Sequence, residues 1–214
     1  MAIQLNETET RILGCLIEKQ VSTPEYYPMS LNSLTSACNQ KTNRSPVVAY
    51  DEATVQAGLD SLRRQGLAAL VQRTDSRTQK YGHAFTDRFD LDAKEVAVLC
   101  ELMLRGPQTS GELRNRCERL CAFQDLKEVD ETLQGLMDLP EPLVARLPRR
   151  PGQKEQRFCH LFSGLTETGP SAADEKVQPS PAPEVEALAA ELKEVREELN
   201  ALKTEFEKFR GQFT

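Results

Sequence analysis

The stretch Leu5-Asn6-Glu7-Thr8-Glu9 is matched later in the chain by Leu91-Asp92-Ala93-Lys94-Glu95. In each stretch a capping residue, Asn6 or Asp92, precedes a glutamate by three positions, which is the spacing of a capping box at a helix N-terminus. Apolar residues then follow at helical spacing: Ile12, Leu13, Leu16 and Ile17 in the first copy, Val98, Leu99, Leu102 and Met103 in the second. The chain therefore carries one plan twice, over residues 5–88 and 91–165, and this repeat indicates the order of elements.

Each copy is predicted to hold three helices followed by a two-stranded hairpin. The second helix follows Pro28 in the first copy and starts at Thr109 or Ser110 in the second, and the third covers residues 51–65, ended by Gly66. In the second copy, the inward residues of the third helix are Val129, Leu133 and Leu136. Short apolar strands follow at residues 67–71 and 143–147.

The return strands of the two hairpins end in Tyr81-Gly82-His83-Ala84-Phe85 and in residues 158–162. Tyr81, His83 and Phe85 alternate and are predicted to share one strand face. Three helices and a hairpin in this order are typical of a winged helix-turn-helix domain. The predicted fold class is therefore mainly α with small β-hairpins (α+β), with winged-helix domains at residues 1–88 and 89–168.

Residues 13–44 carry a further resemblance. The segments Leu13-Gly14-Cys15-Leu16-Ile17-Glu18-Lys19, Thr23-Pro24-Glu25-Tyr26-Tyr27-Pro28-Met29-Ser30-Leu31-Asn32 and Ala37-Cys38-Asn39-Gln40-Lys41-Thr42-Asn43-Arg44 closely resemble the YceH family of bacterial proteins. The resemblance spans both copies and implies two tandem winged-helix domains. It brings no established activity and no catalytic residue with it.

Winged helices that bind DNA place the third helix in the major groove and touch the backbone or minor groove with the wing, the loop of the hairpin. Phosphate contacts require lysine or arginine. The predicted DNA-binding residues are the basic side chains of the third helix of the first copy, the loop before it and both wings: Lys41, Arg44, Arg63, Arg64, Arg73, Arg77, Lys80, Arg146, Arg149, Arg150 and Lys154.

The charge of the chain argues against this interpretation in part. The net charge is −6, and residues 125–138, which include the third helix of the second copy, hold several carboxylates and the single basic residue Lys127. The second wing is the most basic segment, yet charges on a hairpin also keep its edge from pairing with other strands. Two hypotheses therefore stand: a DNA-binding regulator, or a scaffold whose winged helices bind protein partners.

Two polar segments of the first copy have open interpretations. Residues 26–28 form one unusual segment, and the loop at 39–44 forms the other. This loop could contact a ligand, a partner or the other domain, or its amides could cap neighbouring helices. The structural role is the favoured one for the loop. His83 and His160 occupy the same repeat position, and a hydrogen-bonded structural role is favoured for both over catalysis.

No pattern of catalytic or cofactor-binding residues is present, so no enzyme activity and no cofactor are predicted. The six cysteines form no CxxC pair and are expected to be free thiols, with Cys38 and Cys117 in the core. A zinc site from Cys117, Cys121, Cys159 and His160 is disfavoured because the first copy has no counterpart, and no metal is predicted. Neither a membrane span nor a signal peptide is apparent, so a cytoplasmic protein is expected.

A linker rich in proline, serine and alanine at residues 169–183 precedes a heptad pattern at 184–214. Its seam is formed by Val185, Leu188, Leu192, Val195, Leu199, Leu202, Phe206 and Phe209. In a parallel dimer each flanking pair, such as Glu191–Arg196 and Glu198–Lys203, is attractive, whereas an antiparallel pair would oppose like charges. The pattern predicts a parallel homodimer, with a higher oligomer or a helix folded back on its own domains as the alternatives.

Overall fold

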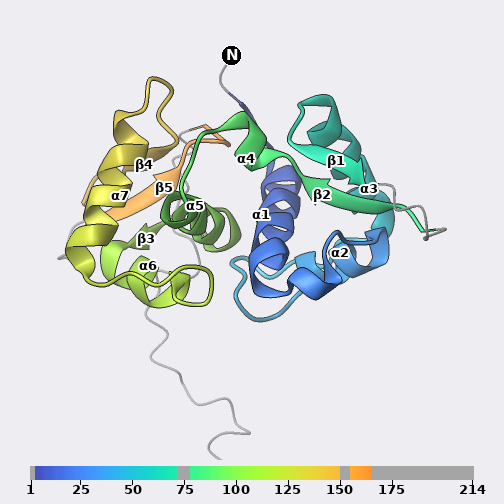
Figure 1. The fold of residues 1–214 in the computed structure, drawn as a ribbon, viewed down its shortest axis with the longest axis horizontal. Helices are drawn as coiled ribbons and strands as arrows, with labels where there is room; N and C mark the ends of the chain where they lie inside the picture. Colours follow the sequence, from blue (N-terminus) through green and yellow to red (C-terminus); the bar gives the residue numbers. More distant parts are fainter. Residues whose placement is uncertain (1–2, 72–77, 150–154, 165–214) are drawn as a thin grey trace, which may run out of the picture. The chain divides into compact units, whose positions relative to one another are not determined.

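The computed structural model describes residues 3–71, 78–149 and 155–164, all within one compact unit, Met1–Glu167. In this part of the chain the fold is mainly helical, with seven α-helices and two small antiparallel sheets of two and three strands (Figure 1). The predicted mainly α class with small hairpins is confirmed at this level. Among these residues no helix has the length and apolar character required to cross a membrane.

The first half begins at a capping box, as the sequence predicts: Asn6 Oδ1 accepts from Glu9 N, and Glu9 Oε2 accepts from Asn6 N, both at 2.9 Å. Asp51 caps the third helix through Thr54 N, and Gly66 ends it with a φ of 71°, a conformation that favours glycine. The elements are α1 (Glu7–Ser22), η1 (Pro24–Tyr26), α2 (Leu31–Cys38), α3 (Glu52–Arg64), β1 (Ala68–Val71) and β2 (Lys80–His83).

The second half repeats this order after the short helix α4 (Phe85–Arg88). Its helices also begin at predicted caps, since Asp92 with Glu95 and Thr109 with Glu112 form capping boxes. The elements are α5 (Ala93–Arg105), β3 (Gln108–Thr109), α6 (Ser110–Cys117), α7 (Leu126–Asp138), β4 (Val144–Arg146) and β5 (Arg157–His160). The bridge between Met29 and Tyr81 in the first half occupies the place of the β3–β5 pairing in the second.

Helices α1 and α5 pack against each other at the centre, with the remaining elements of the two halves on either side (Figure 1). The approach is close because Gly14 has no side chain: a Cβ there would lie 2.9 Å from Leu104 Cδ2. Cys100 Sγ also donates to the Gly14 carbonyl oxygen at 3.4 Å. The halves therefore share one core, and the division into domains at residue 88 stays a prediction.

The end of the first hairpin differs from the predicted strand face. Strand β2 stops at His83, and Phe85 begins helix α4 instead of continuing the alternation. Its ring is fully buried, with ring centroids 4.9 Å from Phe89 and 5.6 Å from Phe162. This aromatic cluster joins both halves. Burying the Phe85 ring in it contributes more free energy than extending β2 to residue 85 would.

Candidate nucleic-acid interface

Helix α3 buries one face and presents the other to solvent. Val55, Leu59 and Leu62 are buried against the core, as predicted, whereas Ala53, Thr54 and Ala57 are exposed. The exposed side chains at positions 53, 54 and 57 are thus short and uncharged. The acidic side chain of Asp60, which is 42% exposed, follows them on the helix. Further charge lies at its ends, with the exposed residues Asp51 and Glu52 before it and Arg63 and Arg64 in the last turn.

The two arginines of α3 differ in their surroundings. Arg63 Nη1 donates to Asp60 Oδ1 at 3.1 Å, and both side chains are 42% exposed, so this ion pair holds Arg63 weakly. Arg64 is exposed at the end of the helix. Strand β2 lies beside α3, because the Tyr81 hydroxyl donates to Gln56 Oε1 at 3.2 Å. Lys80, half-buried, precedes Tyr81 on that strand.

Arg44 does not lie where a DNA contact requires it. Its side chain is fully buried, with Nη2 donating to Glu18 Oε2 at 2.5 Å and Nη1 to Glu18 Oε1 at 3.1 Å. Its Nε also donates to the Ala37 carbonyl oxygen at 3.2 Å. A guanidinium engaged in this way cannot reach a phosphate, so Arg44 is removed from the set of candidate contacts. Lys41, in the same loop, is exposed.

The outer face of α7 is acidic, as the sequence indicates. Asp125, Asp130, Glu131 and Asp138 are exposed, and Lys127 is paired with Glu131 at 3.1 Å. Ser110 Oγ donates to Asp130 Oδ1 at 2.6 Å. A phosphate backbone would be repelled by this face.

The wings are described only in part. Arg146 is exposed and lies over the Phe158 ring, 5.6 Å from its centroid, and Arg149 is exposed beyond β4. The remaining predicted wing residues lie outside the described residues: Arg73, Arg77, Arg150 and Lys154. The seam of the predicted coiled coil, residues 185–209, lies outside them too.

A network of buried ions connects the two halves. Glu18 on α1 and Glu101 on α5 are both completely buried, and Arg119 contacts both, with Nη1 2.5 Å from Glu18 Oε1 and Nη2 2.7 Å from Glu101 Oε1. Arg44 is the second partner of Glu18, and Arg105 Nε lies 2.9 Å from Glu101 Oε2. Two carboxylates thus serve three guanidinium groups.

Burial and pairing act in opposite directions on these charges. Burial by itself would raise the pKa of Glu18, but hydrogen bonds and charge from Arg44, then the charge of Arg119, bring it below its usual range. Burial opposes the charge on Arg44 as well, and Glu18 nevertheless raises its pKa. Both groups are therefore charged at neutral pH, and each depends on the other for compensation.

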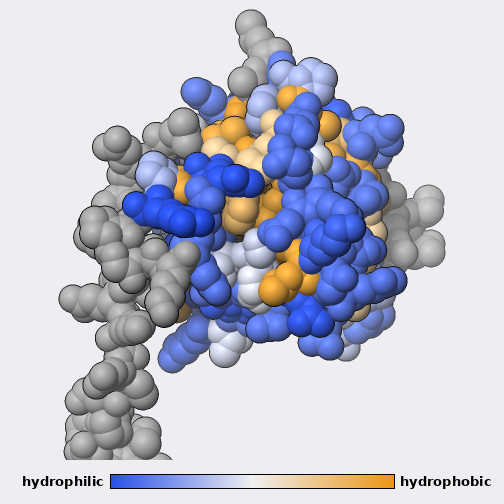
Figure 2. Space-filling model, turned by 90° about the vertical axis from the view of Figure 1, so that its left-hand side faces the viewer, coloured by the Kyte–Doolittle hydropathy of each residue, from blue (hydrophilic) through white to orange (hydrophobic). Residues whose placement is uncertain are grey.

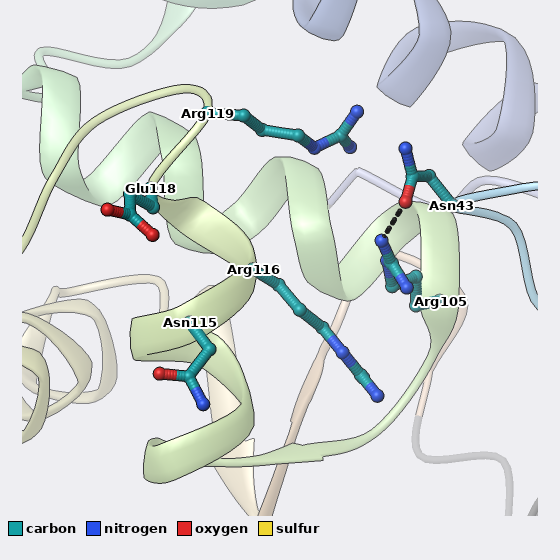
Figure 3. Close-up of a pocket in the computed structure, with 6 residues that line it drawn as sticks. All are labelled: Asn43, Arg105, Asn115, Arg116, Glu118 and Arg119. Carbon is teal, nitrogen blue, oxygen red and sulfur yellow. Dashed lines mark hydrogen bonds between the residues drawn. The ribbon is translucent and has the colours of Figure 1, made fainter. Parts of the chain in front are cut away.

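A shallow pocket opens next to this network, with a volume of about 430 Å³. Figure 3 shows the guanidinium groups of Arg105, Arg116 and Arg119 on one side of α6, together with Asn43, which accepts a hydrogen bond from Arg105. Asn115 and Glu118 line the pocket from the other side of the helix. The walls therefore come from both halves of the fold, and three of the six lining residues are cations.

No sequence pattern groups these pocket residues. One signal was present: Glu18 and Glu101 stand among apolar residues on helices whose inner faces were predicted, and a carboxylate on a buried face requires a cation. The partners of Glu18 are distant in sequence, and Arg119 lies in the other half, whereas Arg105 follows Glu101 by four residues on the same helix. Helical spacing therefore indicates the Arg105–Glu101 pair and does not indicate the partners of Glu18.

The polar loop before α3 has the structural role that was favoured. The side-chain amide of Asn39 donates to the Tyr50 carbonyl oxygen at 2.7 Å and accepts from Tyr50 N at 2.8 Å, which closes the loop. Gln40 Oε1 accepts from Arg44 Nη2 at 3.1 Å. Asn43, with a φ of 58°, turns the chain toward α5.

The two histidines differ. His83 Nε2 is hydrogen-bonded to Gln20 Oε1, and His83 Nδ1 accepts from Phe85 N at 3.3 Å, so the predicted structural role is confirmed for it. His160 stacks on Phe162, but its buried Nδ1 has no hydrogen-bond partner within the described part of the chain, so the prediction of a hydrogen-bonded role does not hold for that atom. Burial lowers the pKa of both rings from 6.5 to about 4.

The cysteines are free thiols, as expected, and Cys38 and Cys117 are both buried in the core. Burial raises the pKa of Cys117 to about 12, so this thiol stays protonated. Within residues 3–71, 78–149 and 155–164, no three histidine, cysteine or acidic side chains are grouped as metal ligands.

Similarity to known proteins covers most of the chain. Residues 5–153 match the model of a family described as "Protein of unknown function, DUF480". A UPF0502 protein of Geotalea uraniireducens is 51% identical over 89% of this chain and 85% of its own length, and one of Opitutus terrae is 51% identical over 83% and 76%. A UPF0502 protein of Pelobacter propionicus is 45% identical over the full length of both chains. The relatives named above are UPF0502 proteins. With this coverage and identity, the chain belongs to the DUF480 family.

Proposed function

We propose that the protein binds duplex DNA through the first half, with α3 in the major groove and the β1–β2 wing on the backbone. The observation that carries the proposal is the outer face of α3, where exposed small residues are followed by Arg63 and Arg64. The major groove is about 12 Å wide and admits one helix. Small side chains permit close approach of the helix, and the two arginines supply phosphate contacts.

The order of elements supports a winged helix-turn-helix in each half. Helices α2 and α3 are followed by an antiparallel hairpin, and α6 and α7 are followed by another. The resemblance of residues 13–44 to the YceH family supports the same arrangement. A DNA-binding, non-catalytic role fits this arrangement, with Lys41, Arg63, Arg64 and Lys80 as the contacts among the described residues.

The second half has a different role in this proposal. Carboxylates cover the outer face of α7, so that helix does not enter the groove, and Arg146 and Arg149 act as backbone contacts only. Figure 2 looks onto the side of the molecule that carries α7 and shows mainly hydrophilic residues with smaller apolar areas between them.

A second candidate function is the binding of a protein partner by α7. Leu126, at the start of that helix, is 48% exposed and lies among acidic residues. An apolar anchor surrounded by carboxylates fits a basic protein surface better than it fits DNA. This function is compatible with DNA binding by the first half, because the two surfaces belong to different helices.

The test of DNA binding is a titration of the full-length protein with random and genomic duplexes at two salt concentrations. Arg63→Gln with Arg64→Gln is expected to weaken binding and to reduce the salt slope by about 2, or roughly 1 for each lost phosphate contact. Arg88→Gln with Arg114→Gln is the matched control, because both are exposed and lie outside α3. Equal losses in the two double variants, or no binding by the wild type at low salt, contradict the proposal.

We also propose that the protein acts as a parallel homodimer through residues 184–213, which rests on the heptad pattern alone. A dimer raises the effective concentration of the second DNA-binding unit once the first is bound. Sedimentation of a chain ending at Gly169 is expected to show a monomer where the full chain is a dimer. A dimer of the shortened chain would locate the contact elsewhere.

A further inference from the structure

The pocket beside α6 differs from the proposed DNA surface in both place and composition. It lies at the junction of α5, α6 and the loop that follows α2, whereas the proposed DNA contacts lie on α3 and the wings, except Lys41, which lies in that same loop (Figure 3). Its positive side chains come from three positions, Arg105, Arg116 and Arg119. The question is what these cations do in addition to balancing the buried carboxylates.

The charges around the pocket are sorted by depth. The carboxylates of Glu18 and Glu101 are 0% exposed, whereas the side chains of Arg105, Arg116 and Arg119 are 19%, 34% and 30% exposed. Glu18 and Glu101 thus lie behind the arginines, whereas Glu112, which pairs with Arg116, is 30% exposed. Glu118 is the one acidic residue among the six that line the pocket.

The guanidinium groups are fixed in position by bonds on their inner sides. Arg116 donates to Gln108 Oε1 at 2.8 Å and to Glu112 Oε1 at 3.3 Å, and Arg119 donates twice to Glu101 Oε1. Arg105 Nη2 donates to Asn43 Oδ1. Groups held in this way lose little freedom when an anion arrives, which favours binding.

Arg105 keeps some donor capacity that the protein does not use. Its Nε is buried and lies 2.9 Å from Glu101 Oε2 without a hydrogen bond, so this atom faces the carboxylate and not the opening. Its Nη1 has no hydrogen-bond partner within the described part of the chain. Burial lowers the pKa of Arg105, and the charges of Arg116 and Arg119 lower it further, in opposition to Glu101. The three cations therefore repel one another, and an anion between them would relieve this repulsion.

We propose that this pocket is a binding site for a phosphate group, with Arg105, Arg116 and Arg119 as donors and Asn43 at its edge. Guanidinium groups bind phosphate through paired N–H donors, and three of them match an anion with several oxygens and more than one negative charge. A simple carboxylate offers two oxygens and a single charge. The volume of about 430 Å³ is within the range of small-molecule sites, so a phosphorylated small molecule fits.

The test is calorimetric titration of the full-length protein with pyrophosphate at constant ionic strength. The wild type is expected to bind in a saturable manner with one site per chain. Arg116→Gln is expected to weaken the affinity about tenfold, since it removes one charged donor pair. Arg114→Gln, with the same change in charge on the same helix but outside the pocket, is expected to stay within about twofold of the wild type.

A second variant is expected to bind more tightly, so its effect cannot be explained by a failure to fold. Glu118→Gln removes the acidic lining residue at an exposed position, so it is expected to tighten pyrophosphate binding about two- to threefold. Circular dichroism checks that each variant is folded. Absence of saturable binding to both pyrophosphate and DNA, or equal effects of Arg116→Gln and Arg114→Gln, overturns the site.

A parallel titration with duplex DNA identifies the source of the phosphate. If Arg116→Gln weakens pyrophosphate binding and leaves duplex binding unchanged, the ligand is a free phosphate compound. If pyrophosphate does not bind and Arg116→Gln weakens duplex binding more than Arg114→Gln does, the site takes a backbone phosphate. The site stands without DNA binding by α3, because the pyrophosphate result does not depend on Arg63 and Arg64.

Discussion

Replacing Glu18 by glutamine is expected to lower the free energy of unfolding strongly, although the shape of the side chain hardly changes. Glu18→Gln keeps the volume of the side chain and removes the negative charge that compensates Arg44. The guanidinium of Arg44 is 0% exposed and has no other carboxylate within ion-pair distance among the described residues. Removing one partner of a buried ion pair typically costs about 3–5 kcal/mol, because the other charge stays buried without compensation.

This cost converts into a large shift of the melting temperature. At roughly 2–4 °C per kcal/mol for a chain of this size, Glu18→Gln is expected to lower Tm by about 6–20 °C. Thermal unfolding followed by circular dichroism at pH 7 measures the shift. Glu25→Gln is the control, since Glu25 is exposed and the same substitution there is expected to change stability by less than about 0.5 kcal/mol.

The pH dependence provides a second measurement of the same network. The pKa of Glu18 in the folded protein lies below its ordinary 4.5, so its contribution is complete above that pH and is lost as pH falls through the lower folded value. Glu18→Gln should lack this part of the acid destabilisation. A Tm equal to that of Glu25→Gln, with an unchanged acid profile, would refute the view that Arg44 depends on Glu18.

Two further predictions concern packing and the histidines. Gly14→Ala is expected to destabilise by about 1–3 kcal/mol because its Cβ would overlap Leu104 on α5, whereas Gly135→Ala, with nothing nearer than 3.7 Å, is expected to stabilise α7 by about 0.5–1 kcal/mol. Urea unfolding checks these opposite signs, and an unchanged or increased stability of Gly14→Ala would contradict the close approach of α1 and α5. The pKa of His160 falls from 6.5 to about 4 on folding, so its neutral form stabilises the fold above pH 6.5 and this contribution is lost as pH falls toward 4. His160→Phe is expected to reduce the loss of Tm between pH 6.5 and 4, and an unchanged slope would show that His160 does not contribute to it.

Local chemistry made the helices predictable from sequence. Asn6, Asp51 and Asp92 cap their helices because their side chains satisfy the first free N–H groups, and this depends only on residues three positions apart. Gly66 ends α3 through its own backbone conformation. The repeat then doubled every such signal, so the order of helices and strands followed.

Contacts between the halves were not predictable in the same way. Arg44 reads as a surface cation in a polar loop, and only the fold brings it to Glu18, 26 residues earlier. Phe85 continues an alternating strand pattern, and the aromatic residues that hold it in α4 include Phe162, which is far along the chain. The candidate phosphate site depends on the same long-range placement, because its residues come from both halves.

The shared ion network has a consequence for biosynthesis. Glu18 leaves the ribosome about 100 residues before Arg119, and at roughly 5–20 residues per second this delay is about 5–20 s. For most of that time the nascent first half has no α5 to cover α1, and Glu18 lacks Arg119, the second of its two arginines. Completion of the first half therefore waits for translation of the second.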